Sequence, residues 1–160
     1  MFTAVRYPLA VLLISQLWTS VAWADVKVED AWVRAAVPGQ AATGAFMVLT
    51  ADQDSQLLQA DSDVAKDVQI HEMLMKDDVM RMQQVKAINL PAKQPVSLDP
   101  HGYHIMLMGL NRTLSAGDTV PITLIVKDGS GQEHSVEVQA PVMPLDATGA
   151  RNSEHSHQGH

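Results

Sequence analysis

Short apolar segments separated by turn residues make up most of the chain after its first 24 residues. In several of these segments apolar and polar residues alternate, which is the period of a strand with one face in a core and the other in solvent. None of them shows the 3.6-residue period of an amphipathic helix. We therefore expect an all-β domain, in the form of an antiparallel sandwich or barrel.

Turn residues set the boundaries of the expected strands. Val37-Pro38-Gly39 and Asp128-Gly129-Ser130-Gly131 each combine residues that favour turns. Lys76-Asp77-Asp78 separates two strand-like segments and predicts a hairpin between them. The expected strands cover residues 26–33, 43–50, 56–58, 68–71, 79–85, 96–98, 103–110, 119–126 and 134–142.

Residues 1–24 have the organisation of a signal peptide. Arg6 is their single charged residue, an apolar run follows from Pro8 to Ile14, and the segment ends in Ala22-Trp23-Ala24, a small-x-small cleavage signal. A membrane-anchoring helix is the alternative, but polar residues interrupt the run before it reaches the roughly 17 to 25 residues that span a bilayer. We expect cleavage after Ala24, export, and no membrane span in the mature protein.

The mature chain should form one domain and a tail. Residues 25–145 are long enough for one domain with its own core. From Asp146 the chain turns polar and ends in RNSEHSHQGH, so we expect residues 146–160 to be a disordered, histidine-rich tail.

Charge and cysteine content narrow the possible functions. Loss of Arg6 with the signal peptide leaves ten Lys and Arg against 18 Asp and Glu, a formal net charge of −8. This balance argues against a nucleic-acid partner, because phosphate contacts need clustered Lys and Arg. The absence of cysteine excludes a disulfide-stapled fold. It also excludes blue copper and binuclear purple copper centres, which need thiolate ligands.

Histidine and methionine concentrate between His71 and Leu110, which hold six of the nine methionines and three of the seven histidines. Imidazole nitrogen and thioether sulfur suit a soft, low-valent ion such as Cu(I). Because alternate residues of a strand share a face, His104, Met106 and Met108 should point the same way. Met80 and Met82 should share a face too, and residues 71, 73 and 75 would align if their strand continued that far.

Packing is the alternative for any one of these methionines, because methionine is a common core filler. Trp32 and Phe46 are most simply core residues as well. The pattern of residues alone therefore names His71 and His104 with some two of the six methionines as candidate ligands. It does not select which two.

The spacing resembles the signature of the periplasmic copper chaperone family called PCuAC, which is His-x10-Met-x21-His-x-Met. His71 is followed after ten residues by Met82, and after a further twenty-one by His104-Ile105-Met106. The signature's optional methionine after the first histidine is Glu72 here. The segments DAWVRA, GYHIMLMGL and GDTVPITL also resemble the family, so the likeness covers nearly the whole mature domain.

The resemblance implies a cupredoxin-like Greek-key β-sandwich or barrel that holds one Cu(I) through His71, Met82, His104 and Met106. It implies a periplasmic chaperone that delivers Cu(I) toward the binuclear copper centre of cytochrome c oxidase. The partners it implies are the copper-bearing subunit of that oxidase and Sco-type proteins, and we expect a monomer. Copper buffering or resistance, and a structural sandwich whose methionines only pack, are the alternatives.

An enzyme is not expected. A histidine-brace oxygenase needs histidine at the mature N-terminus, where Asp25 stands. A hydrolytic zinc site needs nitrogen, oxygen or thiolate ligands, and thioethers serve it poorly.

The other histidines are expected to have different roles. His101 lies in a turn and should be a surface residue, and His134 should be structural or exposed. His155, His157 and His160 could hold a second copper as Cu(II), or they could belong to a solvated tail without a metal role.

Overall fold

The computed structural model describes residues 26–147, which contain ten strands and no helix. No helix in this part of the chain could therefore cross a bilayer. The expected signal peptide, and the expected tail beyond Ala147, lie outside the described residues. The strands are β1 (Val26–Arg34), β2 (Ala42–Ala51), β3 (Ser55–Asp61), β4 (Ala65–Lys76), β5 (Val79–Gln84), β6 (Ile88–Leu90), β7 (Pro95–Leu98), β8 (Tyr103–Leu110), β9 (Thr119–Lys127) and β10 (Glu133–Met143).

The all-β prediction is confirmed, and the main differences from the expected strands are at β3, β4 and β6. β3 covers seven residues, Ser55–Asp61, where three were expected. β4 continues five residues past His71, because its far end pairs with β5 rather than with the rest of the sheet. β6 was not predicted, because three residues beside Pro91 carry too short a pattern, and its place comes from pairing with β3.

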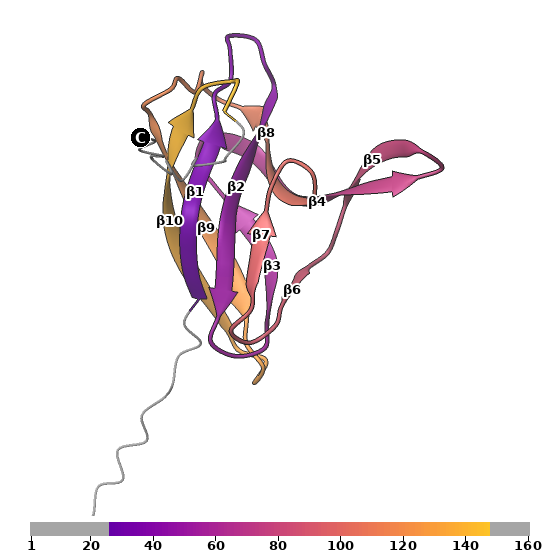
Figure 1. Ribbon diagram of the computed structural model, residues 1–160. Coiled ribbons are helices and arrows are strands. Elements are labelled where there is room, and N and C mark those ends of the chain that lie inside the picture. Colours follow the sequence, from indigo (N-terminus) through magenta and orange to yellow (C-terminus); the bar gives the residue numbers. More distant parts are fainter. Residues whose placement is uncertain (1–25, 148–160) are drawn as a thin grey trace, which may run out of the picture.

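The strands form one open sheet in the order β5-β4-β8-β7-β2-β1-β10-β9-β3-β6. Most neighbours are antiparallel, whereas β1 with β10 and β7 with β8 pair in parallel over one or two residues. The sheet folds over at the β1–β10 pairing, so that β3 and β9 lie behind β1 and β2 (Figure 1). The two layers enclose the core between them, as in a β-sandwich.

Alternating side chains from both layers fill the core. Ile105 and Leu107 of β8 are fully buried, as are Ile122 and Leu124 of β9. Burial of each such side chain contributes about 1.5–3 kcal/mol before the entropy of ordering the chain is counted. The residues between them on β8 must then lie on the outer face of the sheet, away from this core.

The end of the β4–β5 hairpin extends beyond the sheet as an arm, which we define as residues Met73–Met82. β4 pairs with β8 from Ala65 to Glu72, and from Met73 its strand partner is β5. Asp77 and Asp78 close the arm with φ values of 52° and 60°. Two left-handed residues in a two-residue hairpin loop make a type I′ turn, and aspartate tolerates that conformation. Figure 1 shows the arm projecting from the sandwich.

Candidate metal centre

β8 places His104 and Met106 on the outer face of the sheet, because Ile105 and Leu107 point into the core. His104 is nevertheless only 5% exposed. The ring of Phe46 lies beside it, with 6.4 Å between the two ring centroids, and Met82 of the arm lies against it on another side. The histidine is therefore covered by neighbours that are themselves outside the main core.

β4 brings His71 directly opposite His104. The two residues are cross-strand partners, so their side chains share the outer face. Their ring centroids are 5.9 Å apart, with the planes inclined by 57°. A metal–imidazole bond is about 2.0–2.1 Å long, so an ion between the rings could reach a nitrogen of each.

The hydrogen bonds of His104 leave one nitrogen free. Its Nδ1 lies 3.1 Å from the carbonyl oxygen of Gly102, and its Nε2 lies 3.1 Å from the sulfur of Met82. An amide carbonyl is a better acceptor than a thioether, so Nδ1 carries the proton and donates to Gly102. The lone pair of Nε2 then points at a sulfur that has only lone pairs to offer. A soft cation that binds both atoms from one side would satisfy both.

His71 is arranged in the same way with its nitrogens exchanged. Its Nε2 lies 2.9 Å from the side-chain oxygen of Gln69, whose NH₂ group donates to the carboxylate of Asp67. Nε2 therefore carries the proton, and the buried Nδ1 has no hydrogen-bond partner among the described residues. Metal-binding histidines are commonly held by such a bond from the other nitrogen.

Burial lowers the pKa of His71 below its ordinary value of 6.5, and the nearby His104 lowers it further, while Asp67 opposes the shift. The imidazole of His71 is thus held in its neutral form, which is the form that binds a metal.

A pocket of about 270 Å³ opens beside His104, and Met82 and Met106 both line it. His71 does not line this pocket and adjoins it through the ring of His104. The structure thus places all four residues of the expected ligand set in one region. His104 Nε2 and Met82 Sδ are in direct contact, while His71 and Met106 lie beside them.

Sequence reasoning missed the aromatic side of the pocket. Trp32 and Phe46 are buried, as expected, but they pack against each other with 4.5 Å between centroids and stand outside the main core cluster. The guanidinium of Arg34 lies over both rings, at 5.8 and 5.5 Å, and Arg34 lines the pocket with Phe46. The alternation of Trp32 and Arg34 along β1 was the signal that could have placed them on one face.

Gly44 makes room for this arrangement. It is the cross-strand partner of Met106, and a Cβ at this position would lie 2.6 Å from Cζ of Phe46. The missing side chain lets the end of the aromatic ring lie against Gly44. An alanine here would force the ring to shift.

The donor set determines which ion could be held. Among residues 26–147 there is no group of three His, Cys, Asp or Glu side chains placed to bind a metal. The site instead offers two neutral imidazoles and two neutral thioethers, which suit a soft monovalent ion such as Cu(I). Neutral ligands leave a charge of +1, which is less costly to bury partly than a dication.

Neither of the other two histidines in the described part of the chain lines this pocket. His101 is exposed, as expected for its turn. His134 has the structural role that was one of the two expected, because its Nε2 lies 2.8 Å from a carboxylate oxygen of Asp128. His155, His157 and His160 lie outside the described residues.

Comparison with known sequences gives a family and a relative. The family model described as "Putative lipoprotein LpqE-like" matches residues 26–142. The protein described as "Putative lipoprotein Lxx21020" from Leifsonia xyli subsp. xyli is 36% identical over 115 residues, which are 71% of this chain and 69% of that protein.

Comparison with solved structures gives PCuAC domains. The copper-bound PCuAC domain from PmoF2 is 25% identical, with a TM-score of 0.59 over 74% of this chain and 92% of that domain. The apo form of that domain gives a TM-score of 0.60 at 27% identity, over 78% of this chain and 94% of the domain. Cu(I)-bound DR1885 from Deinococcus radiodurans is 32% identical, with a TM-score of 0.53 over 77% of this chain and 80% of that protein. The expected cupredoxin-like fold is confirmed.

Proposed function

The chain belongs to the LpqE-like lipoprotein family, and on that premise we propose that it is a periplasmic copper chaperone without catalytic activity. Its cargo is one Cu(I), bound by His71, Met82, His104 and Met106. The likeness to copper-bound PCuAC domains supports copper as the ion. The oxidation state and the ligands are argued from the residues themselves.

One observation carries the proposal: the contact between His104 Nε2 and Met82 Sδ at 3.1 Å. The other nitrogen of His104 is occupied by Gly102, and Nδ1 of His71 is buried without a partner among the described residues. One imidazole lone pair and a thioether therefore meet at His104 with no proton to join them, and the ring of His71 lies beside them. A soft cation is the natural partner for this set.

The four ligands also differ in how firmly they are held, which suits a carrier. His104 is buried in the sheet, whereas Met82 is 50% exposed on the edge strand β5. An incoming acceptor ligand can displace the thioether of Met82 first and leave the ion on the histidines until a second acceptor ligand binds. Thiolates bind Cu(I) more strongly than thioethers, so the transfer would run toward a thiolate-rich acceptor.

The ligand assignment is tested by X-ray absorption on the Cu(I)-loaded mature protein. We expect mixed nitrogen and sulfur scattering in the first shell and one Cu(I) per chain. Replacement of all four ligands should abolish binding while circular dichroism retains the β-sheet signal. A first shell without sulfur contradicts the assignment, and stoichiometric Cu(I) binding by the fourfold variant would favour a site elsewhere.

The acceptor that we propose is the copper-bearing subunit of cytochrome c oxidase, reached alone or together with a Sco-type protein. Cu(I)-loaded protein is mixed with each purified acceptor domain, the partners are separated, and the copper is counted in each fraction. Movement of copper to the acceptor supports delivery by a monomeric carrier. Retention of copper on the chaperone favours buffering or resistance instead.

The histidine-rich tail is proposed as a separate Cu(II) site, because imidazole also suits Cu(II). Deletion of residues 151–160 should remove Cu(II) uptake and leave Cu(I) binding intact. Binding by the tail should fade as the pH falls through about 6.5, where free imidazole becomes protonated. Unchanged Cu(II) uptake after the deletion contradicts a metal role for the tail.

A further inference from the structure

The arm exposes sulfur that packing does not explain. Met47 of the core is 2% exposed, which is usual for a methionine that fills a core. Met75 is 66% exposed and Met80 is 43% exposed. Among the described residues, five of the eight exposed large apolar side chains lie on the arm. A concentration of this kind on a small domain indicates a site of interaction.

The register of the hairpin orders these methionines into pairs. Met75 is directly opposite Met80, and we call these two the outer pair. Met73 is directly opposite Met82, and these two are the inner pair. Alternate and directly opposed residues share a face, so both pairs lie on the same face as His71. The inner pair lines the pocket beside His104, so this face leads from the arm to the candidate metal centre.

We propose that the outer pair is an entry site for Cu(I), from which the ion passes to the inner pair and then to the histidines. Directly opposed residues have Cβ atoms about 4.5–5.5 Å apart, and methionine has three rotatable side-chain bonds, so two thioethers can meet on one ion. The step to the inner pair covers about 6.4–6.8 Å along the strand. This inference rests on the proposed function, because the inner end of the path is the candidate Cu(I) centre.

Each step is an exchange of ligands. Between the two pairs, one copper–sulfur bond forms as another breaks, and at the histidines a copper–nitrogen bond forms as a copper–sulfur bond breaks. The ion stays Cu(I), and no proton moves, because a thioether carries none and each histidine binds through its unprotonated nitrogen. The direction follows from the donors, because two thioethers alone hold Cu(I) more weakly than a set that includes two imidazoles. Charge does not provide the attraction, since Lys76 and Arg81 balance Asp77 and Asp78 on the arm.

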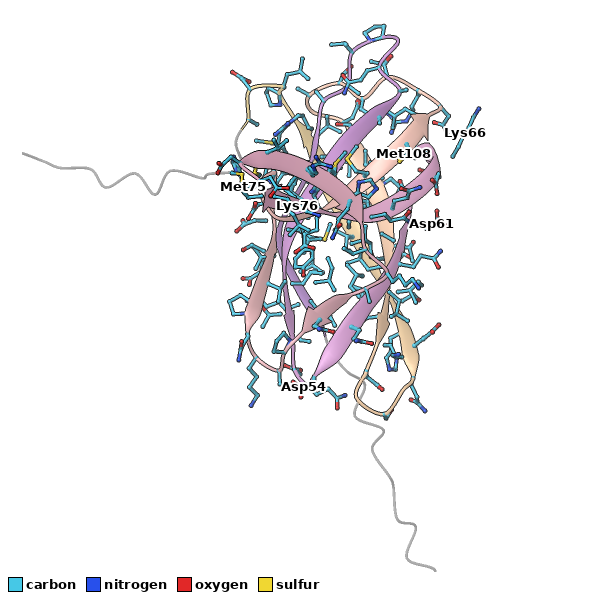
Figure 2. All side chains as sticks on the ribbon, turned by 90° about the vertical axis from the view of Figure 1, so that its right-hand side faces the viewer. Asp54, Asp61, Lys66, Met75, Lys76 and Met108 are labelled. Atoms are coloured by element: carbon cyan, nitrogen blue, oxygen red, sulfur yellow. The ribbon has the colours of Figure 1, made fainter. Side chains whose placement is uncertain are left out.

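Figure 2 looks onto the arm from the side on which it projects, with Met75 and Lys76 on the arm and Asp54 at the lower end of the sandwich. Its exposed position makes the outer pair accessible to a copper donor before the buried His104 is. The ion therefore meets sulfur first and nitrogen second.

The experiment follows the methionine methyl groups of the mature protein by NMR with ¹³C-labelled methyls, while Cu(I) is added under a reductant and without oxygen. The first equivalent should shift the methyls of Met82 and Met106. Further Cu(I) should shift Met75 and Met80 and leave Met143, which is 41% exposed on β10, unmoved. Shifts at Met82 without shifts at Met75 and Met80 overturn the entry site and leave the proposed function standing. Shifts at none of the four overturn the proposed function itself.

A variant tests the path. Met75→Leu/Met80→Leu keeps volume and apolar character, so a surface that only docks apolar partners would survive it, whereas the sulfur is lost. We expect it to take up Cu(I) from a small-molecule complex about tenfold more slowly, because the local concentration of the ion falls. Its affinity for the first ion should be unchanged. Met143→Leu is the matched control and should load like the parent protein. An unchanged loading rate in the double variant overturns the relay.

Discussion

The β4–β5 and β9–β10 hairpins are both antiparallel pairs, and their side chains give them opposite roles. Alternate residues of β9 from Val120 to Val126 are buried in the core. All six residues of β5 are exposed, and the end of its hairpin extends beyond the sheet. The first hairpin therefore draws its stability from the core, whereas the second draws little from packing and presents its side chains to solvent.

The histidines beside the two hairpins have different partners. His134 contacts the carboxylate of Asp128, which also accepts hydrogen bonds from Ser130 and from the backbone of Gln132. His104 contacts the thioether of Met82, which cannot accept a proton in the way a carboxylate does. A carboxylate partner orients an imidazole and closes a turn, whereas a thioether leaves the nitrogen lone pair available to a metal. The partner, more than the histidine, separates a structural site from a candidate metal site.

The largest difference in Cu(I) binding should appear when the histidine of each site is replaced by alanine. His104→Ala should weaken Cu(I) binding by more than about 100-fold, because loss of even an outer hydrogen-bond partner of a metal ligand costs 10- to 100-fold. His134→Ala should leave Cu(I) affinity unchanged. Competition with a Cu(I) chelator measures both. Equal losses in the two variants would remove the distinction between the sites.

Truncation of one leucine in each hairpin should also change the stability of the protein by different amounts. Leu124→Ala in β9 should lower the free energy of unfolding by about 2–5 kcal/mol, because it opens a cavity in the core. Leu74→Ala on the arm should change it by no more than about 0.5 kcal/mol, since this side chain is exposed. Urea unfolding of the metal-free protein compares them. A large loss in Leu74→Ala would show that the arm packs against something in solution.

Acid should act on the β9–β10 hairpin through Asp128. Hydrogen bonds from Ser130 and then His134 hold the pKa of this carboxyl well below its ordinary value of 3.8, against the opposing effect of burial. The unfolded chain therefore takes up the proton first, so the stabilisation is complete above about pH 4 and declines as the pH falls below that value. Asp128→Asn should be less stable at neutral pH and should lose less on acidification.

Urea midpoints between pH 5 and 2.5 measure this difference. If the parent protein and Asp128→Asn declined in parallel, the carboxylate would not be the group that senses acid in this range.

The sequence predicted the strands of the sandwich better than those of the arm. The strand expected from Tyr103 to Leu110 has the bounds that the structure gives β8, where Ile105 and Leu107 anchor one face in the core. The far end of β4, beyond His71, was not among the expected strands. This part does not pack on the core, and it exposes apolar residues such as Met75, so its sequence lacks the pattern of a half-buried strand. Exposure, which the sequence does not carry, separates Met47 from Met75.

The candidate centre depended on a different kind of information. The pattern of residues named His71 and His104 as candidate ligands, and the family resemblance selected Met82 and Met106 from the six methionines. Neither could predict that Gly102 and Gln69 hold the other nitrogen of each histidine, because the strand period does not say which neighbour a side chain contacts. Arg34 was missed for the same reason, since its position over Phe46 follows from the pairing of β1 with β2.

The smallest effect on stability is expected on the outer face of β8, where the sandwich meets the candidate metal centre. Met106 lies opposite Gly44 and lines the pocket, whereas Met108 lies opposite Ala42, one step further from the arm. Met108→Leu roughly conserves volume, so it should cost less than about 1.5 kcal/mol of stability and leave Cu(I) affinity unchanged. Met106→Leu should match it in stability and lose affinity, because of these two methionines only Met106 lines the pocket. Urea unfolding and chelator competition on both variants test the pair. Loss of Cu(I) binding in Met108→Leu would move the boundary of the centre along β8, away from the arm and toward Ala42.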